Sequence, residues 1–332
     1  MARTPLILDV DTGVDDALAL LYAAASPEVE LIGATTVMGN VPVDRAVTNT
    51  LAVLELAGLG DVEVARGAER PLVREHERSP AVHGATGLGR AELPAPDARP
   101  SARSAAQLIV NEARNRPGAI LLVATGPLTN IATALALEPD LPSLLRGFAL
   151  SGGAYARRGT STPAAETNIW LDPDAAQAVF HAFSGEDPLP LCIGLDVTEH
   201  VLFTRDQLRE VCALAPGSPV ARFLSDAVSF YIDHYERARG FAGACMHDPL
   251  ALAVAMDEQL VEFTATRVEV ECDGAWTRGM TVTDLDGVRH TPWPVEWQRT
   301  DNARVALDVR TDAFMTRFLQ RLRTMVAPPV LP

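Results

Sequence analysis

Short hydrophobic runs alternate along the chain with longer amphipathic segments. We interpret the runs as strands and the segments as helices, because a strand buried on both faces is apolar throughout whereas a helix buries one side. The predicted strands are residues 5–10, 31–37, 119–125, 147–153 and 188–197, and the predicted helices are residues 15–26, 43–59 and 128–137. This order predicts an α/β fold, with a mostly parallel, open, Rossmann-like central sheet and helices on both faces.

Polar residues stand where several of the predicted strands end. Asp9 and Asp11 close the first strand, Asn40 follows the second, and Thr125 ends the strand at 119–125. In sheets of this kind ligands bind beyond the carboxyl ends of the strands, so we expect the functional site there.

The chain shows no internal repeat and no linker that would divide it. Residues 74–104 are polar and contain several Pro and Gly, which predicts a long mobile loop. We therefore expect a single domain over residues 1–332.

The composition excludes several classes of protein. The 332 residues carry 43 acidic against 28 basic side chains, a net charge of −15, and every basic residue is Arg. Without Lys, a P-loop lysine, a Schiff-base lysine and a pyridoxal-phosphate lysine are all excluded. The acidic balance with no block of Arg argues against nucleic-acid binding.

No apolar run approaches the roughly 20 residues of a membrane span, so no membrane association is expected. The first strand begins too early to leave room for a signal peptide. The four Cys are scattered without a Cys-x-x-Cys pair, which suits a reducing compartment. These features predict a cytoplasmic protein.

The stretch ILDVDTGVDDALALL, residues 7–21, gathers four aspartates. Asp15 and Asp16 have an ordinary explanation, because acids are favoured in the first turn of a helix. Asp9 and Asp11 lie at the end of a buried strand, where converging carboxylates must take up protons or bind a cation. An all-oxygen ligand set suits Ca²⁺ or Mg²⁺ rather than zinc.

Two further motifs carry polar groups. In CMHDPLALAVAM, Asp248 is predicted either to cap the following helix, with His247 a chance neighbour, or to join the acid cluster. In PAAETNIWLDPDAA, Glu166 and Asn168 are predicted to share one face of an extended segment. Such a pair is suited to hydrogen bonding with sugar hydroxyls, but the same residues also occur in an ordinary turn.

Together the motifs resemble a known family. The stretches DVDTGVDDALAL, TTVMGN, HGATGLG, VATGPLTNIA, AETNIWLDPDAA and HDPLALA follow the order and spacing of the nucleoside hydrolases of the inosine–uridine-preferring type. Weaker similarity continues through VEVECDGAWTRGMTVTD and ARVALDVRTDAF, so it covers essentially the whole chain. The resemblance implies calcium-dependent hydrolysis of ribonucleosides to ribose and free base, in nucleoside salvage, by a homodimer or homotetramer.

The resemblance also implies roles for particular residues. One Ca²⁺ would be held by Asp11, Asp16, the main-chain carbonyl of Thr125 and Asp248. Asp11 would take a proton from the water that attacks C1′ of an oxocarbenium-like ribosyl group, and His247 would protonate the departing base. Asp9 would orient its neighbours.

The substrate would be bound by a second group of side chains. Asp15, Asn40 and Asn168 would contact the ribose hydroxyls, and Glu166 the 5′ side. His83 would close over the base or remain a surface histidine. Residues 229–243 offer base-contacting candidates that also fit a core stripe, namely Tyr231, His234 and Tyr235.

Three positions depart from the family pattern. Thr160 stands where an Asn is usual, Thr167 where an aromatic is usual, and Ser151 where Met is frequent. All three are expected to line the ribose and 5′ region, so a 5′-modified nucleoside is an alternative substrate. Arg157 or Arg158 would be the nearest groups to fill the space.

Two competing hypotheses remain. Haloacid-dehalogenase-type phosphatases also place Asp-x-Asp after the first strand, but they need Thr or Val where Gly13 stands, and a lysine. A non-catalytic ribose- or nucleoside-binding protein on the same fold is the other hypothesis. The presence of Asp11, Asp16, His247 and Asp248 argues against it, and a turnover assay decides.

Overall fold

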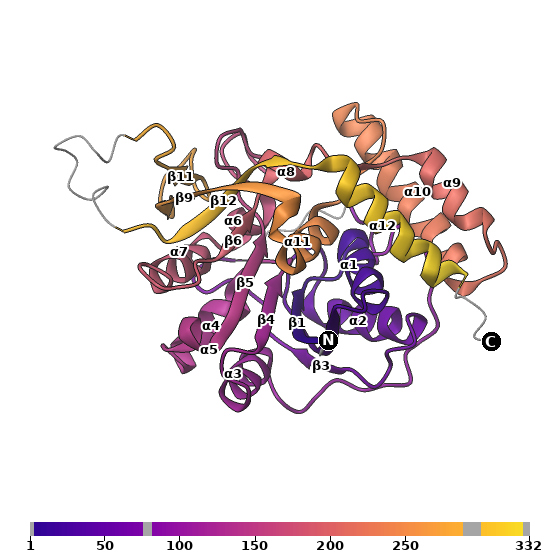
Figure 1. The fold of residues 1–332 in the computed structure, drawn as a ribbon, viewed down its shortest axis with the longest axis horizontal. Coiled ribbons are helices and arrows are strands. Elements are labelled where there is room, and N and C mark those ends of the chain that lie inside the picture. The colour runs from indigo at the N-terminus through magenta and orange to yellow at the C-terminus, as the bar shows by residue number, and fades with distance from the viewer. Residues whose placement is uncertain (1–2, 76–81, 288–299, 328–332) are drawn as a thin grey trace.

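The computed structural model describes residues 3–75, 82–287 and 300–327. Its centre is an eight-stranded sheet of order β3-β2-β1-β4-β5-β6-β12-β9 (Figure 1). All neighbouring strands are parallel except β9, which pairs antiparallel with β12 at one edge. The predicted mostly parallel sheet is therefore confirmed. Its strands are β1 (Thr4–Val10), β2 (Val29–Thr36), β3 (Glu63–Arg66), β4 (Ile120–Ala124), β5 (Leu145–Ser151), β6 (Leu191–Ile193), β9 (Val261–Thr266) and β12 (Ala303–Val309).

Helices cover both faces of this sheet, as predicted (Figure 1). One apolar core lies under α1 (Val14–Ala24), α2 (Val43–Leu56), α9 (Arg205–Ala213), α10 (Pro219–Arg239), α11 (His247–Met256) and α12 (Thr311–Val326). The other lies under α3 (Ala105–Asn115), α4 (Thr129–Leu137), α5 (Leu141–Leu144) and α7 (Pro173–Ala182). Shorter elements are α6 (Thr167–Leu171), α8 (Leu195–Thr198), η1 (Glu258–Leu260) and the strand pairs β7 (Leu202–Phe203) with β8 (Ala244–Cys245) and β10 (Val268–Val270) with β11 (Thr281–Thr283).

The central strands are mostly apolar because they supply both cores. In β1, Leu6, Leu8 and Val10 point into the first core, whereas Ile7 points into the second. Successive side chains of a strand alternate between faces, so a strand covered on both sides is apolar at most positions, and the buried Asp9 of β1 is an exception.

The predicted elements are confirmed, with bounds that differ by a few residues. The run at 188–197 contains only the three-residue β6, because the chain turns into α8 directly after Gly194. The helix predicted over 43–59 ends at Leu56, and Gly58 follows with a left-handed φ of 74°. Within the predicted loop, residues 82–104 contain neither helix nor strand, and residues 76–81 lie outside the described part. Its mobility stays a prediction.

The carboxyl ends of the parallel strands bring the polar motifs together. Asp11, Thr125 and Ser151 follow or end β1, β4 and β5, which are neighbours in the sheet. No helix in the described ranges is long and apolar enough to cross a bilayer.

Candidate active site

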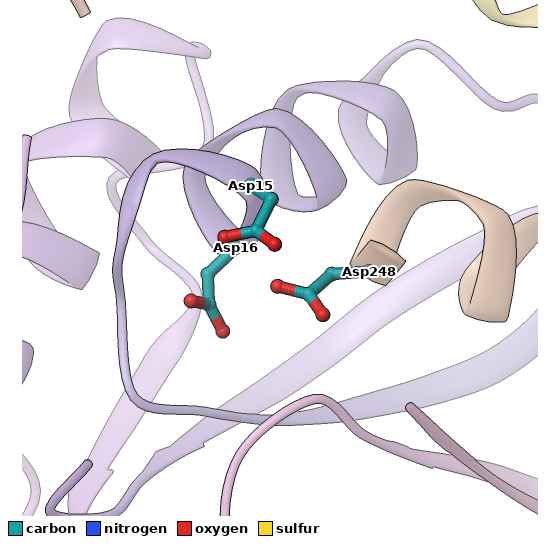
Figure 2. A group of neighbouring side chains, drawn as sticks. All are labelled: Asp15, Asp16 and Asp248. Carbon is teal, nitrogen blue, oxygen red and sulfur yellow. The ribbon is translucent and has the colours of Figure 1, made fainter. Parts of the chain in front are cut away.

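Three buried aspartates converge beyond the end of β1. Asp15 and Asp16 lie in the first turn of α1, and Asp248 lies in the first turn of α11, which packs against α1. Figure 2 shows the three carboxylates turned toward a common space. One oxygen from each lies within 4.8 Å of the others, and none of the three residues is more than 5% exposed.

Backbone and hydroxyl donors hold Asp16 in place. Its carboxylate accepts the N–H of Gly13 at 2.8 Å and the hydroxyl of Thr125 at 2.8 Å. Asp15 is held less completely, since the Tyr231 hydroxyl donates to Oδ2 at 3.0 Å while the buried Oδ1 has no hydrogen-bond partner. This buried oxygen, 3.7 Å from His83 Nδ1, is therefore available to a cation or to a hydroxyl donor.

Asp11 is bound by the loop after β2. The backbone N–H of Asn40 donates to Oδ2 at 2.6 Å, and the Asn40 amide donates to Oδ1 at 3.0 Å. Gly39 permits this approach, because a Cβ there would lie 1.9 Å from Oδ2. The three-carboxylate group contains Asp15 rather than Asp11, although the charge of Asp11 contributes to raising the pKa of Asp248.

The main chain at Thr125 is fixed from two sides. Its N–H donates to the carbonyl of Asp9 at 2.8 Å, and its own carbonyl accepts the Asn168 amide at 2.8 Å. The same amide donates to the carbonyl of Ser151 at 2.9 Å. Asn168 thereby joins the ends of β4 and β5.

Burial raises the pKa of all four acids. Loss of water is the largest cause for Asp11, Asp16 and Asp248, and it raises the pKa of Asp15 to about 6. Neighbouring carboxylates raise the pKa values of Asp11, Asp16 and Asp248 further. Buried carboxylates whose pKa values are raised in this way form an all-oxygen ligand set, which suits a hard divalent cation.

The structure decides between the alternatives for Asp248 and corrects one prediction about local structure. Asp248 joins the carboxylate group and does not cap α11, since the helix begins one residue earlier, at His247, and has no side-chain cap. Glu166 and Asn168 do not lie on an extended segment. Glu166 is the N-cap of α6 and accepts the N–H groups of Asn168 and Ile169, because a carboxylate there satisfies free helical donors.

A cavity of about 470 Å³ opens beside the three aspartates. The predicted residues that line it are Asp15, Asn40, His83, Thr125, Ser151, Thr160, Glu166, Thr167, Asn168, Tyr231, His234, Tyr235, His247 and Asp248. Asp11 and Asp16 are fully buried and do not line it. Arg239 lies in the lining of the cavity. Arg157, which was a candidate to fill the 5′ region, forms an ion pair with Glu199 at 2.6 Å.

Burial lowers the pKa of two of the histidines that line the cavity. The Nδ1 of His83 accepts the N–H of Val14 at 3.1 Å, and burial lowers its pKa to about 4. Burial lowers the pKa of His247 to about 3. The Nε2 of His247 lies 2.7 Å from the Tyr235 hydroxyl, and Nδ1 lies 2.7 Å from the Thr198 hydroxyl.

Several lining residues were not predicted, among them Thr198, Ser161, Trp170 and Arg239. Thr198 follows β6, a predicted strand, so the rule that ligands bind beyond strand ends offered a signal for it. Arg239 ends the 21-residue α10, and its place at the cavity depends on how that helix packs.

The comparisons with known proteins identify the family. Residues 6–316 match the family described as "Inosine-uridine preferring nucleoside hydrolase". The chain belongs to this family. The pyrimidine-specific ribonucleoside hydrolase RihA of Shewanella woodyi is 37% identical over 321 residues, covering 96% of this chain and 98% of that protein. The probable uridine nucleosidase 2 of Arabidopsis thaliana is 35% identical, covering 96% and 98%.

Solved structures agree with this nucleoside hydrolase assignment. The purine-preferring ribonucleoside hydrolase from Gardnerella vaginalis superposes with a TM-score of 0.88 at 35% identity, covering 97% of this chain and 99% of that one. This nucleoside hydrolase is therefore an enzyme that cleaves the N-glycosidic bond of ribonucleosides.

Removing one charge from the three-aspartate group should stabilise the metal-free protein. In EDTA at pH 8, we expect Asp248→Asn to raise the free energy of unfolding by about 1 kcal/mol or more. The reason is that burial and the neighbouring carboxylates disfavour the ionised form of Asp248, and each unit by which its pKa is raised corresponds to about 1.4 kcal/mol. Urea unfolding measures this.

The control is Asp61→Asn at an exposed position, which should change stability by less than about 0.5 kcal/mol. If Asp248→Asn destabilises the protein in EDTA, the carboxylates do not repel one another as described.

Proposed function

We propose that this chain, acting as a single domain, hydrolyses ribonucleosides to ribose and free base in a calcium-dependent reaction. The observation that carries the proposal is the group of three buried carboxylates, with oxygens within 4.8 Å, at the side of a cavity of about 470 Å³. Such a group is unfavourable without a cation, and the cavity has the size of a small-molecule site.

The residues fit one Ca²⁺. The ligands would be Asp11, Asp16, Asp248 and the carbonyl of Thr125, all oxygen donors, with the unpartnered Oδ1 of Asp15 beside them. When bound, the ion would lower the pKa of the attacking water and accept ribose hydroxyls.

Side chains of the protein would activate the water, stabilise the ribosyl cation and bind the ribose. Asp11, fixed by Asn40, would take the proton of the water that attacks C1′. The cluster of carboxylates favours the positive charge that develops on the ribose ring. The amide N–H groups of Asn40 and Asn168 already donate to protein oxygens, which leaves their amide oxygens to accept ribose hydroxyls.

The base would leave toward the end of the cavity lined by α10. Tyr231 and Tyr235 line it there, and the ring of His83 lies tilted against that of Tyr231, with 5.1 Å between ring centroids. His247, in contact with the Tyr235 hydroxyl, is the group we assign to protonation of the departing base. A homo-oligomeric state and a cytoplasmic location are part of the proposal.

A second candidate substrate is a 5′-modified ribonucleoside. The hydroxyl side chains of Thr160, Ser161 and Thr167 line the cavity, and Ser161 donates to or accepts from Thr167 at 2.9 Å. Glu166 is already occupied by three backbone N–H groups. This wall therefore offers short side chains in place of the amide and aromatic groups usual in the family.

The direct test is release of free base from inosine and uridine. We expect activity that is lost in EDTA and restored by CaCl₂, and Asp11→Ala should lower kcat by roughly three orders of magnitude, because it removes a metal ligand and the base together. Full activity of this variant, or of the chelated enzyme, would falsify the proposal. An inactive wild type that still binds nucleosides would favour the non-catalytic binding protein.

The wall of hydroxyl side chains predicts tolerance at the 5′ position. We expect 5′-deoxyuridine and 5′-deoxyinosine to keep kcat/KM within about tenfold of the parent nucleosides, since a lost neutral hydrogen bond is worth about 1 kcal/mol. Thr160→Asn should widen that gap. Strict rejection of 5′-deoxy substrates by both proteins would mean that these substitutions have no effect on specificity.

A further inference from the structure

The imidazole of His247 is held at both nitrogens by hydroxyl groups. Thr198, the last residue of α8, is 1% exposed, and its Oγ1 lies 2.7 Å from Nδ1. The Tyr235 hydroxyl lies 2.7 Å from Nε2. The two contacts come from opposite sides of the ring, so together they determine its orientation.

The Tyr235 hydroxyl extends this chain of contacts to the aspartates. It lies 3.4 Å from the Tyr231 hydroxyl, and Tyr231 donates to Oδ2 of Asp15 at 3.0 Å. The Nε2 of the ring therefore faces α10, whereas Nδ1 faces α8.

The Thr198 hydroxyl can serve either protonation state of the ring. A hydroxyl both donates and accepts, so Oγ1 donates to an unprotonated Nδ1 and accepts from Nδ1–H when the ring is protonated. The contact is therefore kept while His247 gains a proton and gives it up at Nε2.

We propose that Thr198 is a positioning residue for departure of the base. Its hydroxyl holds the His247 ring with Nε2 beside Tyr235 in the cavity, and a protonated ring would give its Nε2–H to the leaving base and keep the hydrogen on Nδ1. This inference rests on the proposed function, because it assigns Thr198 to the step in which His247 acts. Thr198 itself does not contact the reacting atoms; it acts through the imidazole.

The test compares substrates that differ in their need for this step. A purine or pyrimidine is a poor leaving group without a proton, whereas 4-nitrophenolate leaves from 4-nitrophenyl β-D-riboside unassisted. We expect Thr198→Val to lower kcat for inosine and uridine by roughly 10- to 100-fold, since a buried acceptor loses its donor. KM, and kcat on the nitrophenyl riboside, should stay within about threefold of wild type.

Matched variants separate positioning from folding. Thr198→Ser keeps the hydroxyl and should recover most of the lost kcat. Thr266→Val changes another buried threonine, on β9, and should leave the kcat for both kinds of substrate unchanged. The ¹⁵N NMR spectrum should show Nδ1 of His247 hydrogen-bonded in the wild type and in Thr198→Ser, and without that hydrogen bond in Thr198→Val.

Several results would overturn the inference. These are an equal loss on both kinds of substrate, no loss on either, a serine variant as slow as the valine variant, or a wild-type Nδ1 that shows no hydrogen bond. The NMR result stands even if Thr198→Val does not fold. A wild type that cleaves the nitrophenyl riboside but no nucleoside would also overturn it, and inactivity on both would instead reject the proposed function.

Discussion

The structure depends on the burial of like charges at the end of its central strand. Asp11, Asp15, Asp16 and Asp248 lose almost all contact with water, and burial raises the pKa of each. Burying these like charges is unfavourable, so the folded state needs a favourable interaction that offsets it. A divalent cation that prefers oxygen ligands is the group that these carboxylates suit. The surrounding donors, from Gly13, Asn40 and Thr125, hold the carboxylates in place without neutralising them.

The parallel sheet makes this concentration of charge possible. Because β1, β4 and β5 end at the same edge, residues far apart in sequence reach one cavity, and Asn168 joins two of the strand ends through its amide. Helices α1 and α11 carry Asp15, Asp16 and Asp248 in their first turns, where the positive end of the helix dipole makes a carboxylate less unfavourable. We propose that the reaction takes place at this same edge.

Much of this arrangement could be predicted from sequence. Continuous apolar runs identify strands buried on both faces, and the Asp motif marks the site because acids at a buried strand end need a partner. The antiparallel edge strand β9 was not predicted, since an edge strand is exposed on one side and its pattern is less apolar. Glu166 was placed on an extended segment, because its capping role depends on the turn that α6 makes after it. Thr198 follows the predicted strand β6, so its place beyond a strand end offered a signal. Arg239 reaches the cavity only through the packing of α10, which periodicity does not specify.

The shared edge also explains why relatives with different substrates resemble this chain equally. The names of the compared proteins include a pyrimidine-specific and a purine-preferring enzyme, at 37% and 35% identity. The proposed activity depends on the cation site that such enzymes would have in common rather than on base contacts. Calorimetric titration of the chelator-treated protein with CaCl₂ tests that site most directly. We expect one Ca²⁺ bound per chain, with affinity at least about tenfold weaker in Asp248→Asn and unchanged in Asp61→Asn. Absence of calcium binding by the wild type, or equal binding by Asp248→Asn, would contradict the assignment of this cation site.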